Sequence, residues 1–476
     1  MDTKKLRQKI LDLAIRGKLV PQDPNDEPAS VLLECIRAEK EQLIKEGKIK
    51  RSKKSAATDK SHYENVPFEI PESWCWTTLG ELCSIKGGKR LPKGKSFADT
   101  ITPHIYIRVT DMKDHTVLLS SLKYIDEDVF AEIKNYTISS NDLYLTIAGT
   151  IGDVGLVPAE LDGANLTENA AKLTDIKCSK QYLMYVLMSS IAQDHFCSRF
   201  HQVAQPKLSL ETASSTLIPL PPYREQLRIA EELDRWLGVV VSVEDDLSEL
   251  TNYVRKIKSK ILDLAISGKL VPQDPDGEPA IELLKRINPD FEPCDNSHYE
   301  NLPENWCLAK VKDVFVINPR NKAEDNTIAG FIPMTLIDDG YSNTFSYEKR
   351  KWGSIKTGFT HFADGDVAVA KISPCLENRK SIVLRDLPNA IGAGTTELHV
   401  FRSSVVVPEY ALYFFKSEYF ISKCVGTFNG VVGQQRVGKN IIEEIQIPIP
   451  PINEQTKIVS TIETIFTQLN TITAEL

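Results

Sequence analysis

The chain contains two copies of one sequence unit. The hexapeptide ILDLAI at residues 10–15 recurs at 261–266, and GKLVPQDP follows both copies after one intervening residue. The pentapeptide IPLPP that ends at Pro222 recurs as IPIPP ending at Pro451, and a Glu-Gln pair follows each. Repeats of this length indicate that one folded unit is used twice. We therefore expect the chain to fold as two similar halves.

The interiors of the two copies differ far more than their borders. Residues 66–222 and 302–451 are of similar size, and each contains a Pro-Glu-x-Trp motif near its start, ending at Trp74 and at Trp306. Both interiors mix helical segments with strand-like segments rich in β-branched and aromatic residues. A shared frame with different contents suggests a common scaffold that carries two different binding surfaces.

A strict heptad pattern follows the first of these stretches. From residue 229 to 264, apolar residues recur at alternating steps of four and three over five heptads. This period is typical of a coiled coil, and an amphipathic helix packed on a globular core is the alternative. The two ends of the chain carry the same pattern. The predicted seam comprises Ile229, Leu233, Trp236, Val240, Val243, Leu247, Leu250, Val254, Ile257, Ile261, Ile458, Ile462, Ile465, Leu469, Ile472, Leu6, Ile10 and Leu13.

The terminal helices copy the two halves of the central helix. A shift of 229 residues maps the first half onto the C-terminal helix, and a shift of 251 residues maps the N-terminal helix onto the second half. If the two termini meet, the chain closes into a pseudo-twofold ring, and the twofold makes the paired helices antiparallel. We predict an α+β fold: two mixed α/β domains separated by an antiparallel coiled-coil helix pair, in a pseudo-twofold circular arrangement.

The borders of the repeats predict the order of segments. They are an N-terminal half-helix at 1–20, a linker at 21–65, a first domain at 66–222, a central coiled-coil helix at 223–268, a linker at 269–301, a second domain at 302–451 and a C-terminal helix at 452–476.

The distribution of charge bears on nucleic-acid binding. The net charge of −8 at pH 7 opposes binding to phosphates on average, but binding depends on local patches. Five basic residues and no acidic one occur from 86 to 95, in a glycine-containing stretch suited to phosphate contacts. A solvated charged loop is the alternative. A second basic run, at 48–54, lies in the first predicted linker. The five residues are Lys86, Lys89, Arg90, Lys93 and Lys95.

Candidate base-reading residues occupy matching positions upstream of the two proline motifs. Gln, Lys and Arg side chains have the donor geometry for adenine and guanine edges, and a structural turn is an equal alternative at each position. The first domain offers Gln205, Lys207 and Ser209, and the second offers Gln434, Gln435 and Arg436. The further DNA-contact candidates are Arg108, Lys371, Asn378, Arg379 and Lys380.

Several patterns imitate catalytic or metal-binding motifs but lack a required group. Leu220-Pro-Pro-Tyr223 resembles the Pro-Pro-Tyr motif of adenine methyltransferases, yet Leu220 cannot hold the target amino group, so we assign its prolines to the start of the helix. Gly438-Lys439-Asn440 resembles a phosphate-binding loop without the hydroxyl that holds Mg²⁺. The histidines and the nine cysteines show no metal-ligand spacing, and the odd cysteine count favours reduced thiols. We expect neither a catalytic residue nor a metal site.

Taken together, these residues resemble the specificity subunit of type I restriction-modification systems. The resemblance covers essentially the whole chain. It rests on the proline-rich segments with their Glu-Gln pairs, the repeated ILDLAI helix end and the two tryptophans. The second domain adds family-like sequence at 358–362, 366–371, 374–378 and 394–399.

The resemblance implies a non-catalytic recognition subunit. Such subunits bind double-stranded DNA and join two modification subunits to form a methyltransferase. Restriction subunits, which act as motor and nuclease, complete a restriction enzyme. S-adenosylmethionine, ATP and Mg²⁺ would bind the partners and not this chain. Each domain, called a target-recognition domain in that family, would read one half of a split site and direct adenine methylation and restriction. The helices would set the spacing. The expected location is the cytoplasm, since no apolar run is long enough to span a membrane.

Two other functions stay open from the sequence. A methyltransferase or nuclease with a fused specificity unit would need the cofactor chemistry that the motifs lack. A coiled-coil scaffold without a DNA role is the third possibility, and failure to bind any duplex together with partner subunits would favour it.

Overall fold

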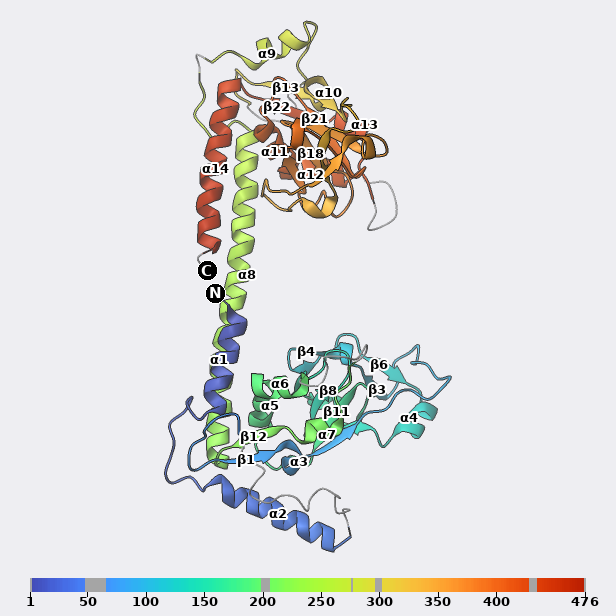
Figure 1. The fold of residues 1–476 in the computed structure, drawn as a ribbon, viewed down its shortest axis with the longest axis vertical. Coiled ribbons are helices and arrows are strands. Elements are labelled where there is room, and N and C mark those ends of the chain that lie inside the picture. Colours follow the sequence, from blue (N-terminus) through green and yellow to red (C-terminus); the bar gives the residue numbers. More distant parts are fainter. Residues whose placement is uncertain are drawn as a thin grey trace. The chain divides into compact units, whose positions relative to one another are not determined.

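Helix α8 (Tyr223–Ile266) is a single helix of 44 residues that contributes to both halves of the chain (Figure 1). The computed structural model describes residues 2–47, 66–197, 206–274, 277–295, 302–427 and 435–474. It divides into two compact units, Met1–Asp245 and Asp246–Leu476. Because the division falls inside α8, the first half of this helix belongs to the first unit and its second half to the second unit.

In the first unit, helix α1 (Thr3–Ile15) runs antiparallel to the first half of α8. Arg7, near the start of α1, forms an ion pair with Glu244 at 2.5 Å. Gln22, which follows the end of α1, donates to the Glu225 carboxylate at 2.6 Å. The earlier residue on one segment thus meets the later residue on the other, which is the predicted antiparallel direction.

In the second unit, helix α14 (Ile452–Ala474) is antiparallel to the second half of α8. The Lys258 ammonium donates to Asn470 at 2.5 Å, near the end of α14. At the other end, Lys457 lies 3.2 Å from the carboxylate of Asp274. The antiparallel direction is thereby confirmed in both units. The meeting of the two termini concerns the relation between the units and stays a prediction.

The buried side of α8 follows the predicted seam and then shifts by one residue. Ile229, Leu233 and Val240 are buried as predicted. Trp236 is 41% exposed, contrary to the prediction, and the next residue, Leu237, packs against the core instead. A straight helix of 3.6 residues per turn drifts by about 20° per heptad from a 3.5-residue repeat. The buried stripe therefore turns toward the domain that α8 also packs on.

Helix α14 shows the same one-residue shift. Ile458 and Ile462 are buried, and Phe466, only 6% exposed, then takes the inner position predicted for Ile465. Ile465 is only partly buried. Since the first half of α8 and α14 depart from the heptad at the same point, the shift belongs to the repeated unit.

The other seam residues divide between buried and exposed positions. Leu6 and Ile257, related by the 251-residue shift, are exposed because the next residues, Arg7 and Lys258, take the inner positions and bind the facing helix. Ile472, close to the end of α14, is also exposed. Buried seam residues are Ile10, Val254 and Ile261, and partly buried ones are Leu13, Val243, Leu247, Leu250 and Leu469.

The first domain contains two four-stranded sheets and two two-stranded pairs. Its strands are β1 (Cys75–Thr78), β2 (Ser84–Gly87), β3 (His104–Ile107), β4 (Met112–Lys113), β5 (Thr116–Val117), β6 (Lys123–Ile125), β7 (Thr137–Ile138), β8 (Leu143–Thr146), β9 (Val154–Leu156), β10 (Ala164–Leu166), β11 (Ala170–Thr174) and β12 (Leu217–Leu220). The sheet orders are β2-β11-β8-β9 and β6-β3-β10-β7, and the two pairs are β1–β12 and β4–β5. Its helices are α3 (Leu79–Leu82), α4 (Glu127–Ile133), α5 (Lys180–Met188), α6 (Ser190–Cys197) and α7 (Leu210–Ser214).

The second domain repeats the two four-stranded sheets and the β1–β12 pair, and among its described residues the β4–β5 pair has no strand counterpart. Its strands are β13 (Cys307–Lys310), β14 (Val316–Ile317), β15 (Ile328–Ile332), β16 (Glu348–Lys351), β17 (Thr360–Ala363), β18 (Val367–Ala370), β19 (Ser381–Val383), β20 (Ile391–Gly394), β21 (Leu398–Arg402) and β22 (Gln446–Ile449). The orders β14-β21-β18-β19 and β16-β15-β20-β17 match those of the first domain, and β13 pairs with β22. Its helices are α10 (Val311–Val314), α11 (Pro408–Lys416), α12 (Glu418–Val425) and α13 (Lys439–Glu443). The predicted common scaffold is confirmed.

The repeated tryptophans tie each domain to its long helix. The Trp74 indole N–H donates to Glu225 in the first turn of α8 at 3.0 Å, and the Trp306 indole N–H donates to Glu454 in α14 at 3.1 Å. Burial raises the pKa of both carboxyls. The matching contacts explain why the sequence repeats at these positions.

The glutamine of each Glu-Gln pair is a second buried joint. Gln226 accepts from the backbone N–H of Ser179 at 2.8 Å and donates to the carbonyl of Pro221 at 2.8 Å. Gln455 accepts from Val407 N–H at 2.7 Å and donates to the Pro450 carbonyl at 3.0 Å. Each amide thus fixes the start of a domain helix against the start of a long helix.

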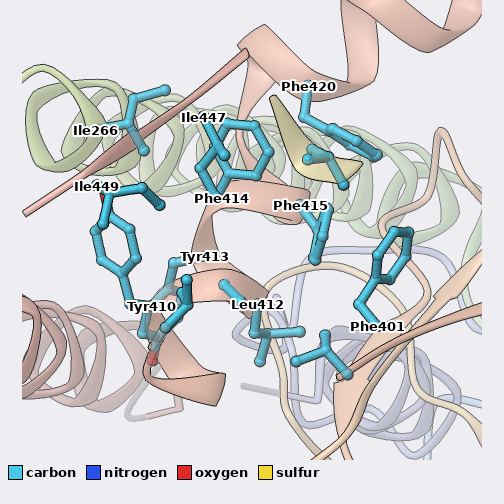
Figure 2. Packing of buried hydrophobic residues seen from close by; sticks show 14 of the residues in the cluster. Ile266, Phe401, Tyr410, Leu412, Tyr413, Phe414, Phe415, Phe420, Ile447 and Ile449 are labelled. Carbon is cyan, nitrogen blue, oxygen red and sulfur yellow. The ribbon is translucent and has the colours of Figure 1, made fainter. Parts of the chain in front are cut away.

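The core of the second unit joins α8 to its domain (Figure 2). Ile266 at the end of α8, Phe415 of α11 and Ile447 of β22 belong to one buried cluster. The Phe415 ring packs on that of Phe401 in β21, with centroids 4.3 Å apart. A single core therefore includes the end of α8, a domain helix and a domain sheet.

The two predicted linkers contain helices. Helix α2 (Ala29–Lys45) lies within 21–65, and its Ala29, Leu33 and Ile36 are buried. Helix α9 (Ala280–Ile287) lies within 269–301 and buries Ala280 and Leu284. Apolar residues spaced three and four apart produce this amphipathic packing. The basic run at 48–54 lies outside the described residues.

Candidate nucleic-acid interface

In each domain, three backbone segments converge at one end of a four-stranded sheet, which is β2-β11-β8-β9 in the first domain and β14-β21-β18-β19 in the second. In the first domain, Ile147 follows β8 and its N–H donates to the Asn169 carbonyl, just before β11, at 2.8 Å. The Leu208 N–H, upstream of α7, donates to the Ile147 carbonyl at 2.8 Å. We call residues 147–148, 168–169 and 207–208 the first junction.

The second domain repeats both of these hydrogen bonds. The Lys371 N–H donates to the Glu397 carbonyl at 2.9 Å, and the Val437 N–H donates to the Lys371 carbonyl at 3.0 Å. We call residues 371–372, 396–397 and 436–437 the second junction. Because the backbone pattern is the same, Ile147, Asn169 and Lys207 of the first domain correspond to Lys371, Glu397 and Arg436 of the second. The chemistry of the side chains differs at all three positions.

The predicted basic loop begins at the first junction. Gly88 N–H donates to the Ala170 carbonyl at 2.9 Å, and a Cβ at Gly88 would lie 2.1 Å from the carbonyl oxygen of Thr167, so only glycine fits there. Arg90, in the loop that follows, pairs with Glu168 at 2.5 Å. The close backbone approach thus brings the basic loop to the same end of the sheet as the junction.

All five predicted cations are exposed, but Lys86 lies in strand β2 and the other four lie in the loop that follows it. Lys95 forms an ion pair with Asp128 at 2.5 Å, and Lys89 lies 5.6 Å from the ring centroid of Tyr136. The exposed positions of Lys86, Lys93 and the others leave the loop accessible to a phosphate backbone.

Arg108 is held within the first domain. Its guanidinium pairs with the fully buried Asp111 at 2.6 Å and donates to the Ser121 carbonyl at 2.8 Å. This side chain stabilises the turn that follows β3. The structure therefore gives Arg108 an internal role that its sequence context did not reveal.

Two candidates of the second domain are also bound internally. Arg379 donates to the Lys416 carbonyl at 3.0 Å and pairs with Glu418 at 2.6 Å. The Lys380 ammonium donates to the Ile337 carbonyl at 2.6 Å. The side chain of Asn378, in the same loop, is exposed. Of these three candidates, Asn378 is the one whose side chain faces solvent.

Lys416 was not predicted and supports the same loop. It is fully buried, and its ammonium donates to the carbonyls of Gly340 and Arg379, each at 2.8 Å. Burial lowers the pKa of Lys416 to about 7. Its counterpart at the end of α5 in the first domain is Met188. The sequence shows that a lysine replaces a methionine here, but it does not show which carbonyls the lysine binds.

The candidates upstream of the proline motifs divide between the junctions and a helix cap. Lys207 forms a bridge with Ala148, and its ammonium lies 3.4 Å from the carbonyl oxygen of Glu168. Ser209 caps α7 by accepting from Thr212 N–H at 3.0 Å, which is a structural role. The carbonyl of Gln435 accepts from Ser373 N–H at 2.8 Å. Gln205 and Gln434 lie outside the described residues.

The imitations of catalytic motifs occupy structural positions. Leu220 is buried at the end of β12, and Tyr223 begins α8, so the prolines separate strand from helix as predicted. Gly438 precedes the short helix α13. Within the described ranges, no three His, Cys, Asp or Glu side chains group as metal ligands, and no helix is both long and apolar enough to cross a membrane.

The comparison with protein families assigns both copies of the unit. The family described as the type I restriction modification DNA specificity domain matches residues 71–248 and 303–476. The chain belongs to this family. Each match begins at the Pro-Glu-x-Trp motif and extends through a junction into a long helix.

Curated relatives carry the same family assignment. The type I restriction enzyme EcoEI specificity subunit of Escherichia coli is 39% identical over 227 residues, which cover 44% of this chain and 38% of the relative. The EcoAI specificity subunit, also of Escherichia coli, is 40% identical over 225 residues, covering 43% and 38%. The matched stretches thus span well under two thirds of these relatives.

A solved structure shares the fold. A chain from a study of complex assembly and conformational transition of the type I R-M system aligns with a TM-score of 0.56 at 16% identity. The alignment covers 86% of this chain and 94% of that chain. At this level of identity, the likeness supports the architecture of two mixed domains and long helices.

Proposed function

We propose that this chain is the DNA sequence-specificity subunit of a type I restriction-modification complex. Each domain reads one half of a two-part site in double-stranded DNA. The observation that carries the proposal is the pair of junctions, where identical backbone hydrogen bonds hold different side chains. A scaffold kept constant while its exposed end changes is what two readers of unlike half-sites need.

The charges near the junctions suit this role. In the first domain, exposed Lys86, Lys89 and Lys93 lie within five residues of the close approach at Gly88 and supply phosphate contacts. In the second domain, Arg436 and Lys371 converge at the matching end of the sheet. These local patches overcome the net charge of −8, because phosphates respond to nearby charges within about 10 Å.

The chain directs chemistry that its partners perform. Two modification subunits methylate adenine with S-adenosylmethionine, and restriction subunits add a motor and nuclease that use ATP and Mg²⁺. In this proposal the long helices hold the two readers and provide surfaces for the modification subunits. The names of the EcoEI and EcoAI relatives, which are specificity subunits of restriction enzymes, support this assignment.

A map of methylated adenines tests the proposal. The full chain, combined with its modification subunits and S-adenosylmethionine, is incubated with unmethylated genomic DNA, and methylated positions are sequenced. We expect one motif composed of two defined parts separated by an unread spacer. Omission of this chain should abolish the motif. Methylation at scattered sites, or an unchanged pattern without the chain, would overturn the proposal.

A control separates recognition from catalysis. The chain alone, with S-adenosylmethionine and the same DNA, should leave adenines unmethylated, because the partners carry the active site. Methylation by the chain alone would favour a fused enzyme.

A further inference from the structure

An arginine at the second junction is held in a fixed orientation. The Nε and Nη2 groups of Arg436 donate to the two carboxylate oxygens of Glu397 at 2.8 and 2.9 Å. This two-point pairing fixes the plane of the guanidinium as well as its position. The Arg436 side chain is nevertheless 45% exposed. The ion pair therefore presents an oriented cation at the surface.

The backbone beneath this pair is anchored on buried groups. Arg436 forms an isolated bridge with Ile372, and the Val437 N–H donates to the Lys371 carbonyl. The Val437 carbonyl accepts from Nε2 of buried His399 at 3.3 Å. Glu397 directly precedes β21 and His399 lies in it, so one short segment of the chain carries both the ion pair and its support.

The protonation of His399 follows from its partners. Asn318 accepts from the Val400 N–H through its side-chain oxygen, which turns its amide N–H toward Nδ1 of His399. Nδ1 therefore accepts a hydrogen bond from this amide. Nε2 must then carry the ring proton, through which it donates a hydrogen bond to the Val437 carbonyl. The imidazole is therefore neutral, consistent with burial that lowers its pKa to about 4. A neutral His399 adds no charge beside the Arg436–Glu397 ion pair.

We propose that Arg436, oriented by Glu397, contacts a guanine in the second half-site, and that Glu397 is the positioning residue for this contact. The inference rests on the proposed function and assigns one base type to one side chain. Arginine paired to O6 and N7 of guanine is the commonest specific contact in the major groove, and it requires an oriented fork. A phosphate contact has no such requirement, because any nearby cation satisfies it.

The first junction lacks the oriented arginine that the second junction has. Its corresponding residue, Lys207, is a flexible single-point donor, and Asn169 stands where the second domain has Glu397. The Arg90–Glu168 pair of the first junction comes from the basic loop and uses a different part of the chain. The two-point pair between these corresponding positions thus belongs to the second domain, so its loss should alter one half-site only.

The test measures base preference and binding strength separately. The full chain and its modification subunits methylate a duplex library randomised in both half-sites, and products are sequenced. Arg436→Lys keeps the charge and removes the fork. We expect preference for guanine at one position of the second half-site to fall roughly 10- to 100-fold, while the salt dependence of binding stays close to wild type. Glu397→Gln should weaken the same position by a smaller factor.

A matched ion pair provides the control. Arg385 donates through Nε and Nη2 to one carboxylate oxygen of Glu409 in the same domain, beyond the other end of the β18–β19 hairpin. Arg385→Lys should leave both half-sites unchanged, which separates base reading from a general loss of structure. The first half-site within the same molecules is a second control for folding and assembly.

Each alternative outcome has a definite meaning. An unchanged motif in Arg436→Lys, or equal weakening on all sequences, would overturn the base contact. A change in the first half-site would overturn the assignment to the second. If the wild-type complex showed no two-part motif, the proposed function would fail instead, and the two failures are thus distinguishable.

Discussion

The two domains share their hydrogen-bonded frame and differ at the end of the sheet. The frame contacts recur almost atom for atom: Trp74 and Trp306 bind a helix glutamate, and Gln226 and Gln455 bind a domain helix. At the junctions, by contrast, Lys207 corresponds to Arg436. Contacts between domain and long helix allow little variation, because each unpaired buried polar group costs about 1–3 kcal/mol. Surface positions above a fixed backbone can change at little cost to stability.

The largest expected effect tests whether the buried Gln226 and Gln455 contacts stabilise their two domains equally. Gln226→Ala and Gln455→Ala should each lower the stability of their own domain by about 2–5 kcal/mol, because each leaves buried backbone groups without partners. Native-state hydrogen exchange in β12 and β22 would report the two domains separately. Gln42→Ala, on the exposed side of α2, is the control and should have little effect. A loss under 1 kcal/mol in either domain would break the equivalence.

Acid should distinguish the domains, because buried His399 of the second corresponds to Ala171 of the first. Burial holds the folded pKa of His399 at about 4. At pH values between about 4 and the unfolded histidine pKa of about 6.5, His399 binds a proton in the unfolded chain but not in the folded domain. Lowering the pH from about 6.5 to 4 should therefore cost the second domain up to about 3 kcal/mol.

Hydrogen exchange at several pH values would measure this loss in β21. His399→Gln should flatten the pH dependence of the second domain and leave the first unchanged. Equal pH profiles for wild type and variant would show that His399 is not the titrating group.

The loops beside the junctions differ in their support. Lys416 donates to two carbonyls, whereas its counterpart Met188 has no donor in its side chain. At pH 8, above the lowered pKa of Lys416, the amine is mainly neutral, so Lys416→Met removes two hydrogen bonds with little relief of buried charge. We expect a loss of about 2 kcal/mol in the second domain. Urea unfolding would measure it, and increased stability would contradict the assigned role.

The smallest effect concerns the shifted seam. Trp236→Ala should change stability by under about 1 kcal/mol, since 41% of the side chain is exposed, whereas Leu237→Ala, which removes a partly buried side chain, should cost about 1–2 kcal/mol. Thermal unfolding of the two variants decides between the strict heptad and the observed shift. A larger loss of stability for Trp236→Ala than for Leu237→Ala would support the strict heptad instead.

Sequence reasoning predicted the repeated frame because its contacts are local to the repeats. The antiparallel helices followed from the circular order of the copies. The heptad failed at Trp236 because packing on the domain, which periodicity does not reveal, selects Leu237. The helices α2 and α9 were missed because short amphipathic segments were read as linkers.

The candidate site was harder to predict because its partners are distant in sequence. Arg108, Arg379 and Lys380 were predicted as DNA-contact candidates, yet they bind groups brought together by the fold. Glu397 was missed because a lone acidic residue gave no signal of its bond to Arg436, 39 residues away. Charge along the chain indicated candidate residues but not the partners that the fold brings to them.

A duplicated reader tests the central claim most directly. In this variant, residues 66–222 replace 302–451, so that both positions carry the first domain on the same helices. Mapping of methylated adenines with the modification subunits should then yield a symmetric motif, with the first half-site present twice in inverted orientation. A motif that keeps the original second half-site, or one without symmetry, would contradict two independent readers on a common frame.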